Sequence, residues 1–427
     1  MTVHDLTLAQ KSRAETVQRV VGASGVEGWL VESYAAPLVA LEFCARGGGA
    51  QDPQGKDGLA TLLAGMLDEG AGDLEARAFH RAVEDLAVHL GFGADADGIS
   101  GHLQTLSRNL GPAFELFAQA LNAPRFDDEA VARVRHQMVA ALKREAFDPD
   151  PMAAKAFRQA AFPGHPYARS TRGEIATVET LERADLAAQS ARLLARDNIK
   201  IAVVGAIDAA TLASKLDEAF GGLPPKAGLT PTPDVALANV GERRIVDLDV
   251  PQATLRFGRP GLAKADPDYF TAIVVNHIFG GGVFTSRLFN EVREKRGLAY
   301  SVHTQLYEYD HCPTLQGAAA TKNERAGETL AVIEAQCREL AEHGPSSEEL
   351  DKAKKFLIGS YPLRFDTSTK IASQLVRIQL DGQEPSYLDE RNRRIEAVTL
   401  ADAKRVAERL FGDGRMLVTA VGRPEGV

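Results

Sequence analysis

Three consecutive glycines stand ahead of a short, highly charged segment in the second half of the chain. The stretch reads FGGGVFTSRLFNEVREKRGLAYSV over residues 279–302. Glycines before a helix often bind phosphate, because free backbone N–H groups and the helix dipole attract anions. A P-loop, however, needs G-x-x-x-x-G-K-[ST], and no lysine follows Gly280, Gly281 and Gly282 at that spacing. The stretch does not match G-x-G-x-x-G with a distant acidic residue either, so no nucleotide site is expected.

Metal ligands and nucleophiles are the next candidates. The chain has ten histidines, and none pairs at i,i+4, the spacing that places two imidazoles on one helix face. His311 and Cys312 are adjacent, so their side chains diverge on a helix or a strand. No G-x-S-x-G elbow and no cysteine–histidine cluster marks a nucleophile. The histidines are therefore expected to be structural or solvated, and no metal site is predicted in this chain.

The segment DGLATLLAGMLDEG at residues 57–70 predicts a core helix. Its apolar residues recur at i, i+3, i+4, i+7 and i+8, the spacing of one buried helix face: Leu59, Leu62, Leu63, Met66 and Leu67. Asp57 is expected to cap the start of the helix and Gly70 its end. The other face has small or polar residues and is expected to be flat and open, which by itself predicts a core helix with a closely packed neighbour: Thr61, Ala64, Gly65 and Asp68.

The chain that positions these residues has the composition of an ordinary globular protein. Its 427 residues are enough for two or three domains; 44% are apolar and 25% are charged. The formal charge of −9 argues against nucleic-acid binding, which needs a basic face. No run of about 20 apolar residues is present to span a membrane. Three scattered cysteines, Cys44, Cys312 and Cys337, do not make a disulfide framework and fit a reduced, cytosolic setting.

The first residues, MTVHDLTLAQKSRAETVQ, contain no apolar core of the kind that a secretory signal needs. The sequence as given therefore predicts a cytoplasmic protein. A processed or engineered N-terminus would make a periplasmic location the expectation instead.

A proline-rich stretch divides the chain into two halves. GGLPPKAGLTPTPD, residues 221–234, is expected to be extended and poor in packing contacts, as linkers between domains are. The predicted division is a first half over residues 1–223, a linker over residues 224–233 and a second half over residues 234–427. Because the halves are similar in length, a duplication is worth testing.

The two halves begin and end with similar patterns. Residues 180–205 and 399–422 each predict a capped helix, a polar turn and an apolar strand that ends in Val-Gly. Each half opens with paired strands ahead of a long helix, which favours antiparallel sheets over strict strand–helix alternation. The sequence therefore predicts an α+β fold of two similar, duplicated halves, each a mainly antiparallel sheet packed with helices on one face.

Together these stretches resemble the pitrilysin, insulinase and mitochondrial-processing-peptidase group of zinc metallopeptidases. GLATLLAGMLDEGA in the first half and GGGVFTSRLFNEVREKRGLAYSV in the second carry the resemblance, which extends over nearly the whole chain, linker included. Members of the group are built from duplicated α+β halves and enclose peptides between two such units. The resemblance thus implies that this chain is half of a chamber and works as a dimer.

The resemblance also implies that this chain has lost the family's zinc motif. The inverted motif H-x-x-E-H falls on Thr61-Leu62-Leu63-Ala64-Gly65. Thr61 and Gly65 stand at the two histidine-ligand positions, and Ala64 stands at the position of the catalytic glutamate. A chain without these groups has neither the metal that acidifies water nor the base that takes its proton.

The family's third zinc ligand is a glutamate about 75 residues further on, and it completes the set of three that a catalytic zinc needs. That distance falls near Ala141 and Leu142, and Glu145 is the nearest carboxylate. One carboxylate does not hold zinc, so the resemblance implies that this chain alone cuts no peptide bond.

The charged stretch, in contrast, keeps the family's pattern. Arg293 and Tyr300 stand where the family has an arginine and, seven residues later, a tyrosine that grip the substrate near its scissile bond. Gly297 is expected to end the helix of Arg293, so that Tyr300 lies on the next strand and two donors converge on one carbonyl. The three glycines resemble the family's flexible substrate-contacting loop. Without the resemblance, Arg293 is a solvated helix charge and Tyr300 a strand aromatic; Lys295 and Arg296 are cations at a helix C-terminus.

We therefore expect a non-catalytic, substrate-binding subunit of a heteromeric zinc metalloendopeptidase. This chain would supply Arg293 and Tyr300, and a homologous subunit with H-x-x-E-H would supply the zinc and the base, so no cofactor is expected in this chain. Two alternatives stay open. One is a non-enzymatic scaffold, like the family members in respiratory complexes, and the other is a peptide-binding homodimer. A gene for an intact H-x-x-E-H homologue beside this one would favour the peptidase.

Overall fold

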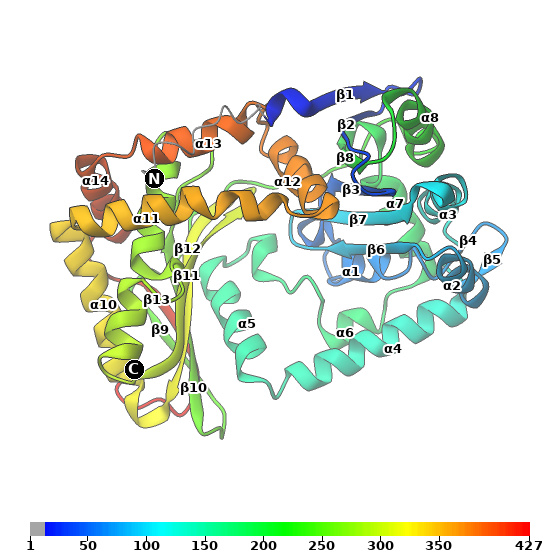
Figure 1. Cartoon of the computed structure of the whole chain (residues 1–427). Helices are drawn as coiled ribbons and strands as arrows, with labels where there is room; N and C mark the ends of the chain where they lie inside the picture. Colours follow the sequence, from blue (N-terminus) through cyan, green and yellow to red (C-terminus); the bar gives the residue numbers. More distant parts are fainter. Residues whose placement is uncertain (1–12) are drawn as a thin grey trace.

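Two β-sheets, each with its own layer of helices, organise the chain (Figure 1). The computed structural model describes residues 13–427. Residues 1–12, which begin the stretch without an apolar signal core, lie outside the described residues. Within residues 13–427, every helix falls short of the length and apolar character that crossing a bilayer requires.

The first sheet has six strands within the described residues, in the order β1-β2-β8-β3-β7-β6. They are β1 (Val17–Val21), β2 (Glu27–Glu32), β3 (Leu38–Arg46), β6 (His89–Ala94), β7 (Gly98–Leu106) and β8 (Ile199–Gly205). Five helices of the same half share one apolar core with the sheet: α1 (Leu59–Ala64), α3 (Leu110–Asn122), α4 (Asp128–Glu145), α7 (Arg183–Leu193) and α8 (Ala209–Phe220). The half also contains β4 (Gly70–Ala71), β5 (Leu74–Glu75), α2 (Ala76–Asp85), α5 (Pro149–Ala161) and α6 (Ile175–Val178).

The second sheet has five strands within the described residues, in the order β11-β12-β10-β13-β9. They are β9 (Arg243–Asp247), β10 (Gln252–Pro260), β11 (Ala299–Tyr309), β12 (Cys312–Lys322) and β13 (Leu417–Gly422). The helices are α9 (Tyr269–Asn276), α10 (Ala326–His343), α11 (Ser347–Gly359), α12 (Ser368–Leu380), α13 (Tyr387–Glu396) and α14 (Leu400–Phe411). The second core joins this sheet to α9, α10, α11, α13 and α14.

The strand order shows that the two halves are duplicates. The series β2-β8-β3-β7-β6 corresponds, strand for strand, to β9-β13-β10-β12-β11. The first pair of each series, β2 with β8 and β9 with β13, is parallel, and the remaining pairs of the two series are antiparallel in residues 13–427. The predicted α+β fold of two similar, mainly antiparallel halves is thus confirmed.

One detail of the predicted sheets is wrong. The two strands directly ahead of the first helix in each half are not neighbours, because the last strand of the half inserts between them: β8 between β2 and β3, and β13 between β9 and β10. The predicted helix–turn–strand endings do form, as α7 with β8 and α14 with β13. Both helices begin with a capping box, at Glu182 and at Thr399.

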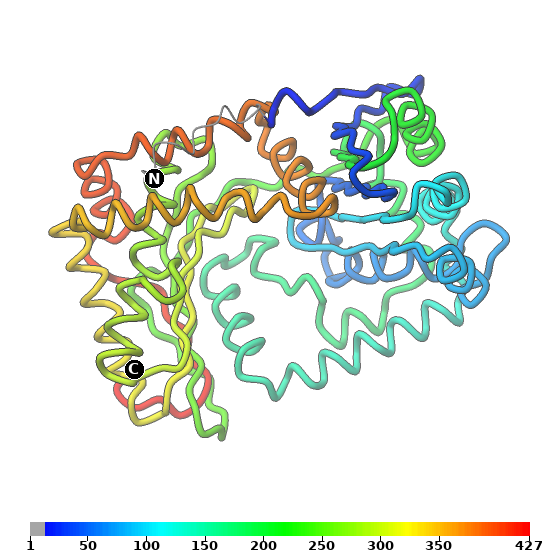
Figure 2. The backbone as a smooth tube through the Cα atoms, in the orientation of Figure 1, coloured from blue at the N-terminus to red at the C-terminus, as the bar shows by residue number. Residues whose placement is uncertain are grey.

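The opposite face of each sheet is covered by a helix from the other half (Figures 1 and 2). Helix α5 of the first half packs on β10 and β13, and α12 of the second half packs on β3 and β8. One buried hydrogen bond ties each helix to its sheet: Gln379 Nε2 of α12 donates to the Ile201 carbonyl of β8 at 2.9 Å, and Thr419 Oγ1 of β13 donates to the Ala153 carbonyl of α5 at 3.1 Å. The prediction of helices on one face of each sheet is therefore incomplete. It does not include α5 and α12, which each cover the opposite face of the other half's sheet.

The proline-rich stretch has no helix or strand over residues 224–242. The expectation that this stretch is poor in contacts is wrong, because the stretch lies along the first half and bonds to it. Thr230 and Gln51 exchange two hydrogen bonds, at 2.8 Å each, and the Gly228 N–H donates to the Arg192 carbonyl at 2.9 Å. Because this extended backbone is not part of a sheet, its polar groups need other partners, and these bonds provide some of them.

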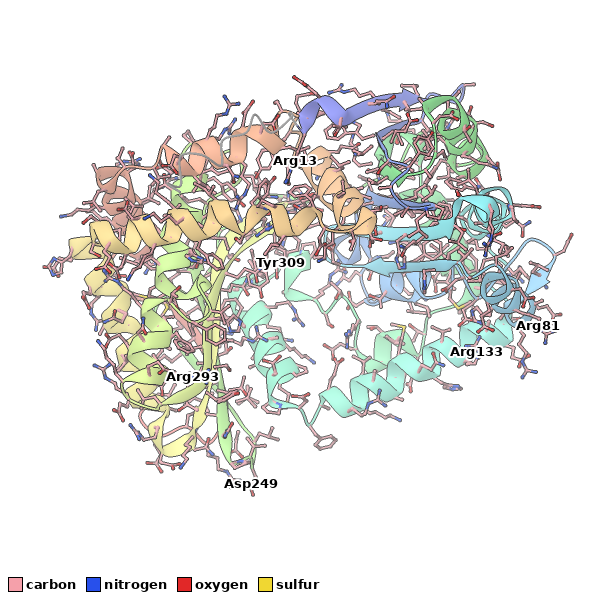
Figure 3. All side chains as sticks on the ribbon, in the orientation of Figure 1. Arg13, Arg81, Arg133, Asp249, Arg293 and Tyr309 are labelled. Atoms are coloured by element: carbon pink, nitrogen blue, oxygen red, sulfur yellow. The ribbon has the colours of Figure 1, made fainter. Side chains whose placement is uncertain are left out.

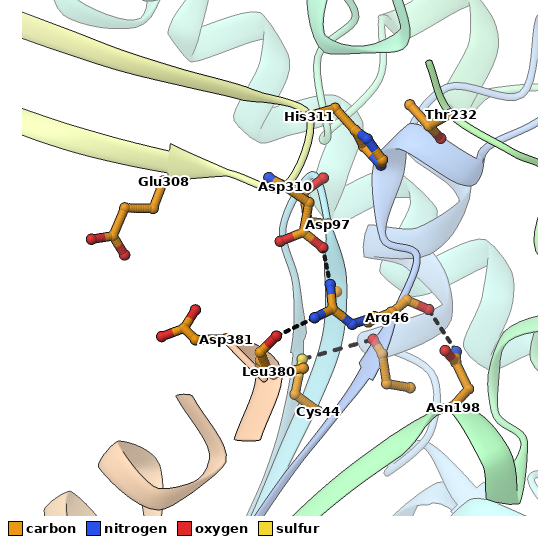
Figure 4. Close-up of polar contacts among 12 residues, drawn as sticks. Cys44, Arg46, Asp97, Asn198, Thr232, Glu308, Asp310, His311, Leu380 and Asp381 are labelled. Carbon is orange, nitrogen blue, oxygen red and sulfur yellow. Dashed lines mark hydrogen bonds and ion pairs between the residues drawn. The ribbon is translucent and has the colours of Figure 1, made fainter. Parts of the chain in front are cut away.

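A polar junction also joins the halves (Figure 4). Arg46, at the end of β3, pairs with Asp310 in the turn between β11 and β12 and donates to the Leu380 carbonyl at the end of α12. The Asp310 N–H donates to Asp97 at 3.1 Å, and Asp97 also accepts the Tyr167 hydroxyl at 2.5 Å. The two halves therefore meet through side chains as well as through the exchanged helices.

Candidate functional site

The helix that carries the zinc-motif positions is shorter than predicted. Helix α1 spans Leu59–Ala64, and turns occupy residues 65–68. The five apolar residues predicted to face the core are all buried. Gly70, expected to end the helix, has φ +105° and lies in β4.

Asp52, not Asp57, caps α1. The Asp52 carboxylate accepts the N–H groups of Gly58 and Ala60, both at 2.9 Å. Asp57 instead pairs with Arg169 at 2.9 Å. Gly58 has φ +97°, and a side chain there would approach the carbonyl oxygen of Arg172 to 2.8 Å. This tight turn carries the chain past Asp57 before the helix begins.

The three degenerate positions are covered to different degrees. Thr61 donates its hydroxyl to the Thr171 carbonyl at 2.6 Å, and Ala64 is only 2% exposed. Gly65 has a helical φ of −71°, and a Cβ there would lie 3.5 Å from Val134. Thr61, Gly65 and Asp68 are half-buried, and α4 and α7 are the close neighbours that pack against this helix.

These residues do not fit a zinc ion. Thr61 is engaged with the backbone, Ala64 and Gly65 have no donor atom, and Glu145 at the end of α4 pairs with Arg172. Across residues 13–427, no group of three or more histidine, cysteine, aspartate or glutamate side chains is arranged to hold a metal. Zinc ligation needs three protein donors at a catalytic site, and this part of the first half offers no such set.

The cysteines are not poised as nucleophiles. Burial raises the pKa of Cys44 to about 12, that of Cys312 to about 11 and that of Cys337 to about 12. A thiol with such a pKa carries almost no thiolate at neutral pH.

Arg293 and Tyr300 come together in the second half, as the spacing predicts. Arg293 lies in a wide helical turn, Phe289–Glu294, and Gly297 follows with φ +58°, where the chain reverses into β11. The Arg293 guanidinium lies 4.9 Å from the ring centre of Phe289 and 4.7 Å from that of Tyr300. Two aromatic faces therefore hold this cation in place.

A β-bulge sets the direction of Tyr300. Ala299 pairs with Thr321 and Ser301 pairs with Ala320, so Tyr300 has no partner on β12. A bulge adds one residue to a strand and redirects its side chain. Tyr300 is 81% exposed, which leaves its hydroxyl available to a ligand.

The Arg293 guanidinium has unused donors. Its nearest carboxylate oxygen, on Glu294, is 3.8 Å away, beyond hydrogen-bond distance, and its side chain is 32% exposed. Within residues 13–427 it makes no hydrogen bond. Lys295 and Arg296, in contrast, both pair with Glu291, at 2.5 and 2.6 Å, and these bonds lower the pKa of the Glu291 carboxyl. Arg293 thus differs from its basic neighbours.

The glycines lie in a helical turn and not in the expected loop. Gly280 and Gly281 belong to the turn His277–Gly281, which continues α9, and Gly282 ends it. A Cβ on Gly280 would lie 2.5 Å from the Thr304 hydroxyl, and one on Gly281 would lie 2.8 Å from the Asn276 amide. The glycines let the end of this helix approach β11 closely.

Two apolar residues directly after the glycines also belong to this site, although no sequence motif marks them. Val283 is 65% exposed and Phe284 is 70% exposed. The Phe284 ring meets the edge of Phe289, with ring centres 5.4 Å apart. In the sequence, the available indication is the pair of apolar residues VF directly after GGG, in a stretch otherwise expected to be a polar loop.

These residues line one groove of about 950 Å³ in the second half. Arg293, Tyr300, Phe284 and Gly281 are at its rim or wall, together with residues of β11, α12 and α13. Figure 3 places Arg293 in the lobe of the second sheet, far from Arg81 and Arg133 in the other lobe. The groove joins hydrogen-bond donors to apolar walls, the composition of a peptide-binding or ligand-binding site.

Comparison with known proteins identifies the family. A family model described as Insulinase (Peptidase family M16) matches residues 30–174, and one described as Peptidase M16 inactive domain matches residues 180–357. The chain belongs to the M16 peptidase family.

Individual relatives agree with this assignment. The chain is 28% identical over 337 residues to a Helicobacter pylori protein named non-peptidase homolog YmxG, covering 79% of this chain and 78% of that one. It is 22% identical over 391 residues to mitochondrial-processing peptidase subunit beta of Lentinula edodes, covering 87% and 82% of the two chains. It is also similar to the crystal structure of a peptidase M16 inactive domain from Pseudomonas fluorescens, with a TM-score of 0.89 and 27% identity over 96% of this chain and 98% of that one.

Proposed function

We propose that this chain is the non-catalytic, substrate-binding subunit of a heteromeric zinc endopeptidase. A homologous subunit with an intact H-x-x-E-H motif supplies the zinc ion and the general base. This chain supplies the Arg293–Tyr300 pair and its groove.

One observation carries the proposal: a chain of this peptidase family has a groove with free donors, and its residues 13–427 contain no set of side chains arranged to bind zinc. Arg293 is held by two rings, and its N–H groups are unused within residues 13–427. The zinc-motif positions hold a bonded threonine, a buried alanine and a glycine. The loss of the zinc motif removes metal-assisted hydrolysis from this chain, but Arg293, Tyr300 and the groove that would hold a peptide remain.

The chemical role of the pair follows from its geometry. A guanidinium fixed between rings presents its N–H edge without the entropy loss of ordering a free side chain. The Tyr300 hydroxyl, redirected by the bulge, is the second donor. Together they would hydrogen-bond a substrate carbonyl and stabilise the charge that develops on it, and zinc held by the partner would supply the activated water.

The partner is proposed on the chemistry that this chain lacks. Peptide hydrolysis by this family needs a metal-activated water and a base, and neither fits the residues at positions 61, 64 and 65. The name of the Lentinula edodes relative describes it as one subunit of a peptidase, which supports a shared enzyme.

Metal analysis and peptidase assays of the isolated chain test the first half of the proposal. We expect no stoichiometric zinc after dialysis and no hydrolysis of a fluorogenic peptide above background, with or without added zinc. About one zinc ion per chain, or cleavage that a chelator stops, would overturn the placement of the degenerate motif.

A further inference from the structure

The groove beside Arg293 is lined by more basic than acidic side chains. Its charged residues are five basic ones and two acidic ones: Lys264, Arg293, Arg364, Arg377, Arg391, Glu308 and Asp381. The whole chain has a formal charge of −9, so a basic groove is a local exception that needs its own explanation.

Two of the basic residues, Lys264 and Arg377, form ion pairs with both acidic residues. Lys264 Nζ lies 2.6 Å from Glu308 and 2.5 Å from Asp381. Arg377 lies 2.8 Å from Glu308 and 3.4 Å from Asp381. These four side chains form a closed network at one end of the groove. The other three arginines have no carboxylate there to pair with.

Arg391 is the most unusual of the three, because it is only 5% exposed. Its Nη1 donates to the Leu357 carbonyl at 3.3 Å and to the Asn392 side chain at 2.9 Å, and its guanidinium lies 4.2 Å from the Tyr361 ring centre. Within residues 13–427 it has no ion pair, and its Nε and Nη2 make no hydrogen bond. Burial and the nearby Arg364 lower the pKa of Arg391. A buried charge without a counter-ion is costly, and an anionic ligand removes that cost.

Arg364 and Arg293 extend the basic surface of the groove. Arg364 is exposed and makes no ion pair or hydrogen bond within the described residues. Arg364 lies in the turn Tyr361–Phe365, whose Tyr361 ring packs against Arg391, whereas Arg293 lies in the turn Phe289–Glu294. The positive groups of the groove therefore come from two different parts of the second half, Arg391 with Arg364 and Arg293 by itself.

The remaining walls match a chain molecule better than a single ion. Apolar and aromatic side chains line the space between the charged groups: Ile273, Leu306, Leu357, Ile378 and Tyr387. A volume of about 950 Å³ exceeds what one carboxylate fills. A peptide offers a backbone for Arg293, apolar side chains for the walls and a carboxylate for Arg391.

We infer that this groove selects peptide segments with acidic side chains, whose carboxylate binds Arg391 and Arg364 while Arg293 and Tyr300 hold the backbone. This inference rests on the proposed function and names its substrate class.

Binding of labelled peptides to the full chain tests the inference. Three fluorescein-labelled peptides of the same length are compared by fluorescence anisotropy: one with two glutamates and an amidated C-terminus, the same peptide with glutamines, and the glutamine peptide with a free C-terminal carboxylate. We expect the glutamate peptide to bind at least about tenfold more tightly than the other two, as a charge-assisted hydrogen bond allows. The preference should shrink at high salt, which screens charges.

Variants assign the preference to the arginines. Arg364→Gln, at an exposed position, should weaken glutamate-peptide binding by about three- to tenfold and leave glutamine-peptide binding unchanged. Arg391→Lys keeps the charge but loses the planar fork, and should weaken glutamate-peptide binding by about the same factor. Arg81→Gln removes an exposed arginine from α2 in the other lobe (Figure 3) and is the matched control, with no expected effect.

Each other outcome overturns the inference in a recognisable way. Equal binding of glutamate and glutamine peptides, or an equal loss in Arg364→Gln and Arg81→Gln, refutes acidic selection and leaves the proposed function standing. Tighter binding of the free-carboxylate peptide assigns the site to a C-terminus instead of acidic side chains. Failure of the chain to bind any of the peptides counts against the substrate-binding role itself.

Discussion

The Arg293 guanidinium lies between the rings of Phe289 and Tyr300, and this position determines what substitutions there should do. In the proposed complex with a zinc-bearing homologue, Arg293→Ala should lower kcat/KM roughly 10- to 150-fold, because a charge-assisted hydrogen bond is worth ~1.5–3 kcal/mol. Tyr300→Phe keeps the ring that supports the guanidinium and loses only a hydroxyl, so it should cost about tenfold or less. Steady-state kinetics of the mixture measures both changes.

Arg296→Ala is the control at the same helix end, because Arg296 is engaged with Glu291. It should leave kcat/KM nearly unchanged. Equal losses at Arg293 and Arg296, or no loss at Arg293, would mean that the charged turn is only a solvated surface.

Local spacing predicts the meeting of Arg293 and Tyr300, because one glycine with a positive φ separates a helical turn from a strand. It does not predict the cap of α1. Asp52 reaches the helix from beyond a turn at Gly58, so the nearer Asp57 looks like the better cap in the sequence alone. Nor does spacing reveal Arg391, whose burial depends on α11 and α13 packing together.

At the scale of elements, the exchanged helix α12 leaves a carboxyl group in an apolar layer. Glu42 lies on β3, beside Ala202 on the face that α12 covers. Burial raises the pKa of Glu42 from 4.5 to about 7. The exchange itself is not visible in the sequence, because α5 and α12 have ordinary amphipathic patterns that do not say which sheet they cover.

The pKa of Glu42 predicts a pH-dependent stability. Between about pH 4.5 and 7 the folded chain holds a proton that the unfolded chain has released, so the free energy of unfolding falls as the pH rises through that interval. Glu42→Gln cannot ionise and should be more stable than the natural chain by about 2–3 kcal/mol at pH 8 and equally stable near pH 4. Urea denaturation at both pH values measures the difference. Glu179→Gln, at an exposed position, should show no such dependence, and a gain at Glu42 that is the same at both pH values would contradict the assignment.

The fluorescence of Trp29 reports on the packing of α12 against the first sheet. Trp29 is the chain's one tryptophan, is 3% exposed and shares a core with Leu375 of α12. Leu375→Ala should destabilise the chain by about 2–5 kcal/mol, with tryptophan emission lost at lower denaturant concentration although the substitution lies in the other half. Ser373→Ala on the exposed side of α12 is the control. An unchanged Trp29 transition in Leu375→Ala would show that α12 does not hold the first sheet.

At the scale of the whole molecule, the exchange of α5 and α12 joins the halves into one cooperative unit. Unfolding monitored by Trp29 fluorescence should coincide with unfolding monitored by far-UV circular dichroism, because neither half keeps its full core without the other. Two separated transitions would mean that the halves unfold independently. The duplication itself could be predicted, because the same helix–strand pattern ends both halves; the strand order and the exchange depend on contacts between distant parts of the chain.

The whole-molecule claim is a division of labour between two homologous chains, and peptide hydrolysis by a reconstituted mixture tests it most directly. The chain is mixed with an H-x-x-E-H homologue encoded in the same genome, and cleavage of a peptide is followed with each chain alone and with both. We expect cleavage that a chelator stops in the mixture, little cleavage by the homologue alone, and a loss when Arg293→Ala replaces the natural chain. Full activity of the homologue alone, unaffected by adding this chain, would contradict the account.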